Sequence, residues 1–223
     1  MNNHLTTEVF DMSKLKYKLL VLLFAASISA IAKDNYEDPY KGYDESLYMD
    51  MELNDNLMLP KVGNKEHSAV KLYMNRLAQD LARRHYTVDM MRNDEVVLVT
   101  IPSDELFIPN DTLLAPVAPT KLMPIVSLLK DSEMMKVVYA IHTDNTGSSS
   151  YNMYLSHERN NSIYDWLLDN ISEDLIVIPY EFGDTEPLVP NDSREGRAEN
   201  RRVEIYLIPG PKMITLAHKG LLK

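Results

Sequence analysis

The sequence predicts an α/β (α+β) two-layer sandwich, a mixed β-sheet with helices on one face, in the order strand, helix, strand, helix, strand, strand. Apolar runs rich in β-branched residues indicate strands. Apolar residues at three- and four-residue spacing indicate amphipathic helices. The alternation of the two favours helices packed against a sheet. The strand-like runs are 96–101, 134–141, 175–178 and 203–208, and the helical ones are 120–129 and 150–170.

The segments around the first strand complete this pattern. Residues 66–86 carry apolar side chains at helical spacing and predict an amphipathic helix ahead of the sheet. Residues 103–119 are expected to be a loop, because three prolines prevent regular structure there. The next helix opens at Pro119 or Thr120 and tolerates Pro124 only if that residue lies in the first turn. A second long polar loop is expected over 183–199, before the last strand.

The composition excludes several classes of protein. The formal net charge of -10 argues against a nucleic-acid binder, which would carry a basic surface to neutralise phosphates. The absence of cysteine excludes a disulfide scaffold, a Cys-ligated metal centre, a thiol nucleophile and a lipidated N-terminal cysteine. No motif in the chain indicates a cofactor.

The first 32 residues have the features of a secretory signal peptide. Lys14, Lys16 and Lys18 precede an apolar run over 19–32 that ends in small residues. The run is shorter than the roughly 20 residues that a membrane-spanning helix needs. We therefore expect cleavage after Ala32, and retention as an anchor is the alternative.

An acidic leader with interleaved tyrosines follows the signal peptide. No helical or strand period persists in it, which favours a solvated and flexible tether. The alternative is a docking segment whose aromatic side chains pack on a partner or on the domain itself. The expected organisation is a signal peptide over 1–32, the leader over 33–65, an N-terminal helix within 66–90, the sheet domain over 91–210 and a C-terminal tail over 211–223.

Polar residues gather at the end of the second predicted strand and on the helix after it. Thr143 and Asp144 come directly after the strand, where ligand groups tend to sit in α/β layers. Asn152, Leu155 and Arg159 share one face of the helix, because residues three, four and seven positions apart lie on the same side. These five residues are candidates for a ligand pocket.

A carboxylate and a guanidinium that face one small volume suit a zwitterion such as the α-group of an amino acid. Asp144 would take the ammonium group, and Arg159 would take the carboxylate, ideally with two parallel hydrogen bonds. Arg201, which follows the long loop, is a second candidate cation. The alternative is that Asp144 and Arg159 form a structural ion pair with each other.

The same region does not favour catalysis or metal binding. His142, Asp144 and Ser156 supply the residue types of a hydrolase triad, but no nucleophile-elbow motif surrounds Ser156, which lies within a predicted helix. No second histidine cluster with ligand spacing accompanies His142, so no metal site is predicted. We expect His142 to be a hydrogen-bonded structural residue and the chain not to be an enzyme.

The order of these residues resembles the OmpA-like C-terminal domain, a family that includes peptidoglycan-associated lipoproteins and flagellar stator anchors. The resemblance covers about residues 95–208 and includes the Leu106-Phe107 loop. It is carried by His142-Thr143-Asp144, Gly147, Tyr151-Asn152, Leu155-Ser156 and Arg159, followed by Gly196-Arg197 and Asn200-Arg201-Arg202-Val203.

The resemblance implies non-covalent binding of peptidoglycan through the diaminopimelate of its stem peptide. The family's Asp and helix Arg match Asp144 and Arg159, which together would hold the α-amino and carboxylate groups. The Asn and Leu of its helix motif match Asn152 and Leu155, and the first Arg of its Asn-Arg-Arg motif matches Arg201.

This sequence departs from the family pattern at three positions. Ile141 stands where the family usually has Gly before His, and it is expected to narrow the backbone approach at the strand end. Asn160 replaces the Ala that usually follows the helix Arg, and Asp184 replaces the Glu that usually follows Gly183. None of the three removes a ligand-contacting group.

We expect a protein of the Gram-negative periplasm, either free or associated with the outer membrane. Its expected partners are peptidoglycan and either an envelope protein or a second copy of the chain. The alternative function is an envelope assembly protein that binds another protein through its leader and first helix. A truncation beginning near Asp94 would separate the two functions, because wall binding is expected to survive it under the first.

Overall fold

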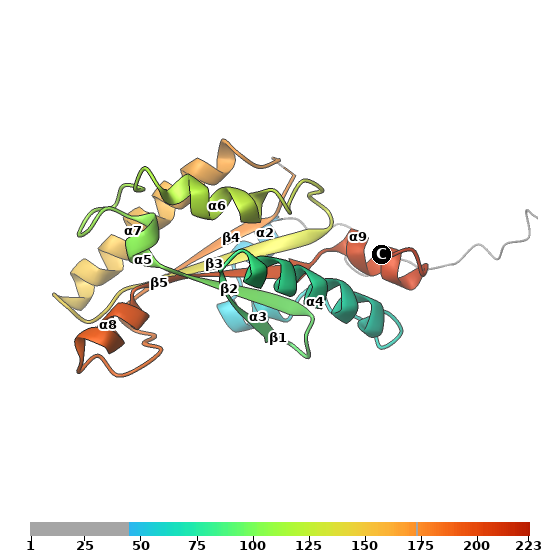
Figure 1. Ribbon diagram of the computed structural model, residues 1–223, viewed down its shortest axis with the longest axis horizontal. Coiled ribbons are helices and arrows are strands. Elements are labelled where there is room, and N and C mark those ends of the chain that lie inside the picture. Colours follow the sequence, from blue (N-terminus) through green and yellow to red (C-terminus); the bar gives the residue numbers. More distant parts are fainter. Residues whose placement is uncertain (1–44, 173) are drawn as a thin grey trace, which may run out of the picture. The chain divides into compact units, whose positions relative to one another are not determined.

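The computed structural model describes residues 45–172 and 174–223 (Figure 1). The predicted signal peptide and the first part of the leader lie outside the described residues. Within the described ranges, no helix has both the length and the apolar content that a membrane crossing requires.

A five-stranded mixed sheet forms the centre of the domain. The spatial order is β1-β2-β5-β3-β4, and β3 and β4 are parallel while all other neighbours are antiparallel. Every residue of β3 and β5 is buried, as expected for strands that are covered on both faces. The strands are β1 (Thr87–Met91), β2 (Val96–Pro102), β3 (Met135–His142), β4 (Val177–Gly183) and β5 (Arg202–Pro209).

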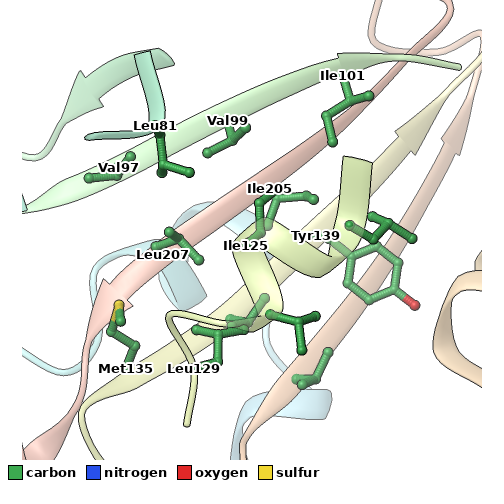
Figure 2. Close-up of a cluster of buried hydrophobic side chains, with 14 of the residues drawn as sticks. Leu81, Val97, Val99, Ile101, Ile125, Leu129, Met135, Tyr139, Ile205 and Leu207 are labelled. Atoms are coloured by element: carbon green, nitrogen blue, oxygen red, sulfur yellow. The ribbon is translucent and has the colours of Figure 1, made fainter. Parts of the chain in front are cut away.

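Four helices supply the main core on one face of this sheet. They are α4 (His67–Arg83), α6 (Ala118–Val126), α7 (Ser149–Leu168) and α9 (Pro211–His218). Alternate residues of β2, β3 and β5 point toward them, because successive side chains of a strand face opposite sides. Figure 2 shows this layer, in which the labelled side chains are Leu81, Val97, Val99, Ile101, Ile125, Leu129, Met135, Tyr139, Ile205 and Leu207.

Two short leader helices, α2 (Glu45–Met49) and α3 (Leu53–Leu57), cover the opposite face of the sheet. Tyr48 and Leu57 are buried there against Val138 and Ala140 of β3. The described part of the leader is therefore a docked segment and not a free tether. The predicted fold class is confirmed, with the addition that these leader helices occupy the second face.

Several elements were not predicted from the sequence. The edge strand β1 alternates only between exposed and half-buried residues, so its pattern is weak, and its antiparallel pairing with β2 stabilises it. The helix α5 (Ser103–Leu106) and the helix α8 (Arg194–Asn200) interrupt the two predicted loops, and α9 forms most of the predicted tail. The helices α5, α8 and α9 are short, and the spacing of apolar residues predicts such short helices poorly.

The expectation that Pro124 lies in a first helical turn is wrong. The helix α6 begins at Ala118, so Pro119 occupies its start and Pro124 lies further inside it. Proline cannot donate a hydrogen bond to the carbonyl four residues earlier, which belongs to Thr120. Since Thr120 is exposed, water can satisfy that carbonyl, and the helix continues.

Candidate functional site

The ends of β3 and β4 lie against the first half of α7. Thr143 donates its backbone N–H to the carbonyl of Gly183 (2.8 Å), and the Gly183 N–H donates to Ser156 Oγ (3.2 Å). Gly183 has φ of 52°, and a Cβ there would lie 3.0 Å from the backbone nitrogen of Met153. Only glycine allows both this backbone conformation and this close approach.

The start of α7 is set by its cap. Ser148 Oγ accepts a hydrogen bond from the N–H of Tyr151 (3.2 Å), which satisfies one of the unpaired donors of the first turn. Helical spacing then directs Asn152, Leu155 and Arg159 to one side, and all three are buried.

A pocket of about 510 Å³ lies at this junction, and all six candidate residues line it. They are Thr143, Asp144, Asn152, Leu155, Arg159 and Arg201. The other six lining residues were not predicted from the sequence, and they are Asp104, Pro109, Asn110, Thr146, Gly147 and Tyr151.

Asp144 provides a buried carboxylate in the pocket. Its Oδ1 accepts the backbone N–H of Thr146 (2.7 Å), and its Oδ2 accepts Arg201 Nη1 (2.7 Å). Burial by itself raises the pKa of Asp144, but the hydrogen bonds from Arg201 and Thr146 outweigh it and hold the pKa below its ordinary value. Asp144 is therefore ionised at neutral pH.

Arg159 is a buried cation, only 5% exposed, that forms no ion pair with any residue the structure describes. Its Nε donates to the carbonyl of Asp111 (3.0 Å), and its guanidinium lies 4.7 Å from the ring centroid of Phe107. Burial lowers the pKa of Arg159, but a guanidinium still remains charged. The predicted alternative of an Asp144–Arg159 ion pair is wrong, because Asp144 pairs with Arg201 instead.

Asn152 adds an unsatisfied donor to the pocket wall. Its side chain is 2% exposed, and Nδ2 has no hydrogen-bond partner among residues 45–172 and 174–223. A buried amide donor without an acceptor costs free energy, so such groups are uncommon unless a ligand or water meets them.

Arg201 follows a loop that Asn200 holds together. The buried Asn200 side chain accepts the N–H of Val189 (3.0 Å) and donates to the carbonyl of the same residue (2.8 Å) and to Asn191 Oδ1 (2.9 Å). The loop therefore places Arg201 at the pocket, where the Arg201 guanidinium contacts both Asp104 and Asp144.

His142 lies beside the pocket and not in its wall. Its buried ring stacks on Phe182 with 5.1 Å between ring centroids, and Nε2 lies 3.3 Å from Glu204 Oε2. In the part of the chain that the structure describes, no three or more His, Cys, Asp or Glu side chains form a group that could hold a metal ion.

The three departures from the family pattern lie outside the pocket lining. Ile141 is fully buried in the main core, so it does not narrow the pocket. Asn160 donates to Glu181 Oε2 (2.9 Å), and Asp184 accepts from Ser149 Oγ (3.0 Å).

Only the tertiary structure shows that Asp104 and Asn110 line the pocket. Both come from the segment between β2 and α6, where the sequence shows no pattern that distinguishes pocket residues from surface ones. Tyr151 stands within the quoted motif, but its place there did not indicate a pocket-facing side chain.

The chain is similar to several known proteins. A family model described as "OmpA family" matches residues 106–201. "Probable lipoprotein YiaD" of Escherichia coli is 29% identical over 122 residues, which are 55% of this chain and 56% of that protein. "Peptidoglycan-binding protein ArfA" of Mycobacterium tuberculosis is 38% identical over 66 residues, which are 30% of this chain and 20% of that protein. The matched segments thus span about half of the first protein and a fifth of the second.

Two solved structures share the fold. The cell wall anchor of the T6SS from Pseudomonas aeruginosa superposes with a TM-score of 0.50 at 30% identity, over 60% of this chain and 94% of that one. A MotB-like protein from Desulfovibrio vulgaris gives a TM-score of 0.56 at 22% identity, over 65% of this chain and 95% of that one, which supports the fold alone. The segment from 106 to 201, which carries most of the pocket, belongs to the OmpA family.

Proposed function

We propose that this pocket binds peptidoglycan non-covalently, through the amino-acid zwitterion of a diaminopimelate-type residue in the stem peptide. The observation that carries the proposal is that a cation without a carboxylate partner, an amide donor without an acceptor and an ionised acid line one pocket. Arg159 has no carboxylate partner and Asn152 Nδ2 has no acceptor among the described residues, while Asp144 lines the same pocket. A ligand carboxylate would satisfy the donors, and a ligand ammonium would pair with Asp144.

Each of the six predicted site residues then has a role in this binding mode. Arg159 and Asn152 bind the ligand carboxylate, and Asp144 binds the ammonium group. Arg201 supplies a second cation, and Thr143 lines the pocket next to Asp144. Leu155 provides apolar contact for the methylene groups of the ligand.

The names of the relatives support peptidoglycan as the source of this ligand. One is a peptidoglycan-binding protein, and a structural neighbour is a cell wall anchor. Together with the predicted signal peptide, they favour a periplasmic protein that anchors or positions an envelope component, at the outer membrane or with a further envelope protein. The OmpA-family match confirms the prediction that the chain is not an enzyme.

The alternative function, protein binding through the leader and first helix, is less favoured. The apolar faces of α2, α3 and α4 that carry most of their buried side chains pack on the chain's own sheet. Among the large apolar side chains of these helices, Leu47, Met49 and Leu72 remain exposed to a partner.

Co-sedimentation of the full-length protein with purified peptidoglycan tests the proposal. Asp144→Ala and Arg159→Ala are each expected to reduce the bound fraction at least tenfold, since each leaves one ligand charge unpaired. Asp165→Ala and Arg194→Ala are matched controls, because both residues are exposed and lie outside the pocket.

Free diaminopimelate as a competitor identifies the recognised group. It should release the wild-type protein from the wall, while pimelate, which lacks both amino groups, should release far less. If both pocket variants sediment like the wild type, the pocket is not the binding site and the proposal fails.

A further inference from the structure

The Arg201 guanidinium is shared between two carboxylates. Its Nη1 donates to Asp144 Oδ2 (2.7 Å), and on its other side Nε and Nη2 donate to the two oxygens of Asp104 (3.4 and 3.0 Å). The Asp104 contact has the two-pronged geometry that a guanidinium and a carboxylate favour, whereas the Asp144 contact is a single short bond.

This arrangement creates a competition at Asp144. Its Oδ1 is engaged by Thr146 and its Oδ2 by Arg201, and its side chain is only 10% exposed. A ligand ammonium that approaches this carboxylate meets the positive charge of Arg201, and like charges at such short range repel. The ammonium gains its full ion pair with Asp144 only when Arg201 withdraws from it.

Asp104 gives the withdrawn guanidinium a partner. Its side chain is 61% exposed and belongs to α5, just ahead of the segment that the family model matches. Without Asp104, Arg201 would have only Asp144 as a carboxylate partner among its described contacts, and it would hold that carboxylate against the ligand.

We propose that Asp104 is a positioning residue that retains Arg201 when a ligand ammonium displaces it from Asp144. This inference rests on the proposed function, because it assumes that an ammonium group binds at Asp144. Arg201 then moves between two carboxylates. Asp104 is therefore expected to affect the affinity for ligands that carry an amino group and not the affinity for those that lack one.

The test compares two ligands on the full-length protein. Backbone amide shifts in NMR titrations give dissociation constants for diaminopimelate and for pimelate, which has the same carbon chain and carboxylates but no amino group. Asp104→Asn is expected to weaken diaminopimelate about fivefold, in line with a partly exposed ion pair, and to leave pimelate unchanged or slightly tighter. Asp104→Glu should restore most of the loss, because it keeps the carboxylate.

Asp165→Asn is the matched control, since this residue is exposed on α7 and outside the pocket. Equal weakening of both ligands by Asp104→Asn would indicate a structural role and overturn the inference. Unchanged diaminopimelate binding in Asp104→Asn would also overturn it, while leaving the proposed function intact. Absence of diaminopimelate binding by the wild-type protein would overturn both.

Discussion

At the scale of single residues, the buried charges of this domain fall into two kinds. Arg159 lacks a carboxylate partner among the described residues, whereas Glu204, on β5, is surrounded by donors. Arg202 Nε donates to Glu204 Oε1 (2.7 Å), Tyr206 donates its hydroxyl to Oε2, and His142 Nε2 lies 3.3 Å from Oε2. The first kind suits a ligand site, and the second suits a structural network.

The Glu204 network is expected to make stability depend on acid pH. Burial raises the pKa of Glu204, but the neighbouring His142 ring, the hydrogen bond from Tyr206 and the charge of Arg202 outweigh burial and lower the pKa from 4.5 to about 2. The folded state therefore holds the proton less tightly than the unfolded state. The resulting stabilisation is complete above pH 4.5 and is lost as pH falls toward 2, by about 3 kcal/mol at most.

Urea unfolding of the wild type and of Glu204→Gln at several pH values between 6 and 2.5 checks this. The difference in unfolding free energy between the two proteins should shrink as pH falls. A difference that stays constant over this range would show that Glu204 titrates normally in the folded protein.

At the scale of elements, a polar network holds α2 and α3 on the sheet. Lys136 of β3 is 2% exposed, and its Nζ donates to the backbone carbonyl and to Oδ1 of Asn56 (2.7 and 2.5 Å). The same Nζ lies 4.0 Å from the ring centroid of Tyr48. Asn56 Nδ2 in turn donates to the carbonyl of Tyr48 (2.7 Å) and to the hydroxyl of Tyr180 (2.9 Å). One lysine thus connects both leader helices to the central sheet.

Lys136→Met is expected to loosen this attachment. Amide hydrogen exchange should increase in residues 45–57 because Asn56 loses two hydrogen bonds from Lys136 Nζ, while exchange in α7 should not change. Burial, with the nearby charge of Arg92, lowers the pKa of Lys136 to about 7. The unfolded lysine keeps its proton up to about pH 10.4, so wild-type stability should rise with pH from about 7 to 9.5, by at most about 1.4 kcal/mol per pH unit.

Chemical denaturation of both proteins across that range measures the effect. The variant has no lysine at this position and should lack the rise. Equal pH dependence in the two proteins, or unchanged exchange in residues 45–57, would contradict the assigned role of Lys136.

At the scale of the whole domain, α4 is part of the core and not a detachable arm. Val70, Met74, Leu77 and Leu81 of α4 are buried in the main core against the sheet. The helix also contacts α9, and Glu66 at its N-terminal end pairs with His218 of α9 (2.6 Å between Oε1 and Nδ1). The sheet's main face is therefore completed by segments from both ends of the described chain.

A truncation that begins at Asp94 is expected to unfold the domain. It removes β1 and the four buried α4 side chains, each of which contributes roughly 1.5 to 3 kcal/mol on burial. Their sum, roughly 6 to 12 kcal/mol, matches the whole stability of a typical domain, about 5 to 15 kcal/mol. The truncation therefore cannot separate wall binding from protein binding in the way the sequence suggested. Thermal melts followed by circular dichroism should show a cooperative transition for the full-length protein and none for the truncated chain, and a cooperative melt of the latter would contradict this.

Part of the candidate site could be predicted from the sequence. The spacing of Asn152, Leu155 and Arg159 along one helix, and the position of Asp144 after a strand, were enough to place them in one pocket. The partner of Asp144 was not predictable, because Arg201 is 57 residues away and reaches it only through the loop that Asn200 organises. Asp104 was missed for the same reason, since it meets Arg201 across 97 residues of chain.

The sequence by itself determined the central strands, the long helix α7, the family resemblance and half of the residues that line one pocket. These depend on local periodicity and on a fixed order of residues, which a linear chain displays directly. Only the tertiary structure decided which charges pair, which donors remain unmet and where the leader docks. Those outcomes depend on distances between segments remote in sequence, and folding alone sets such distances.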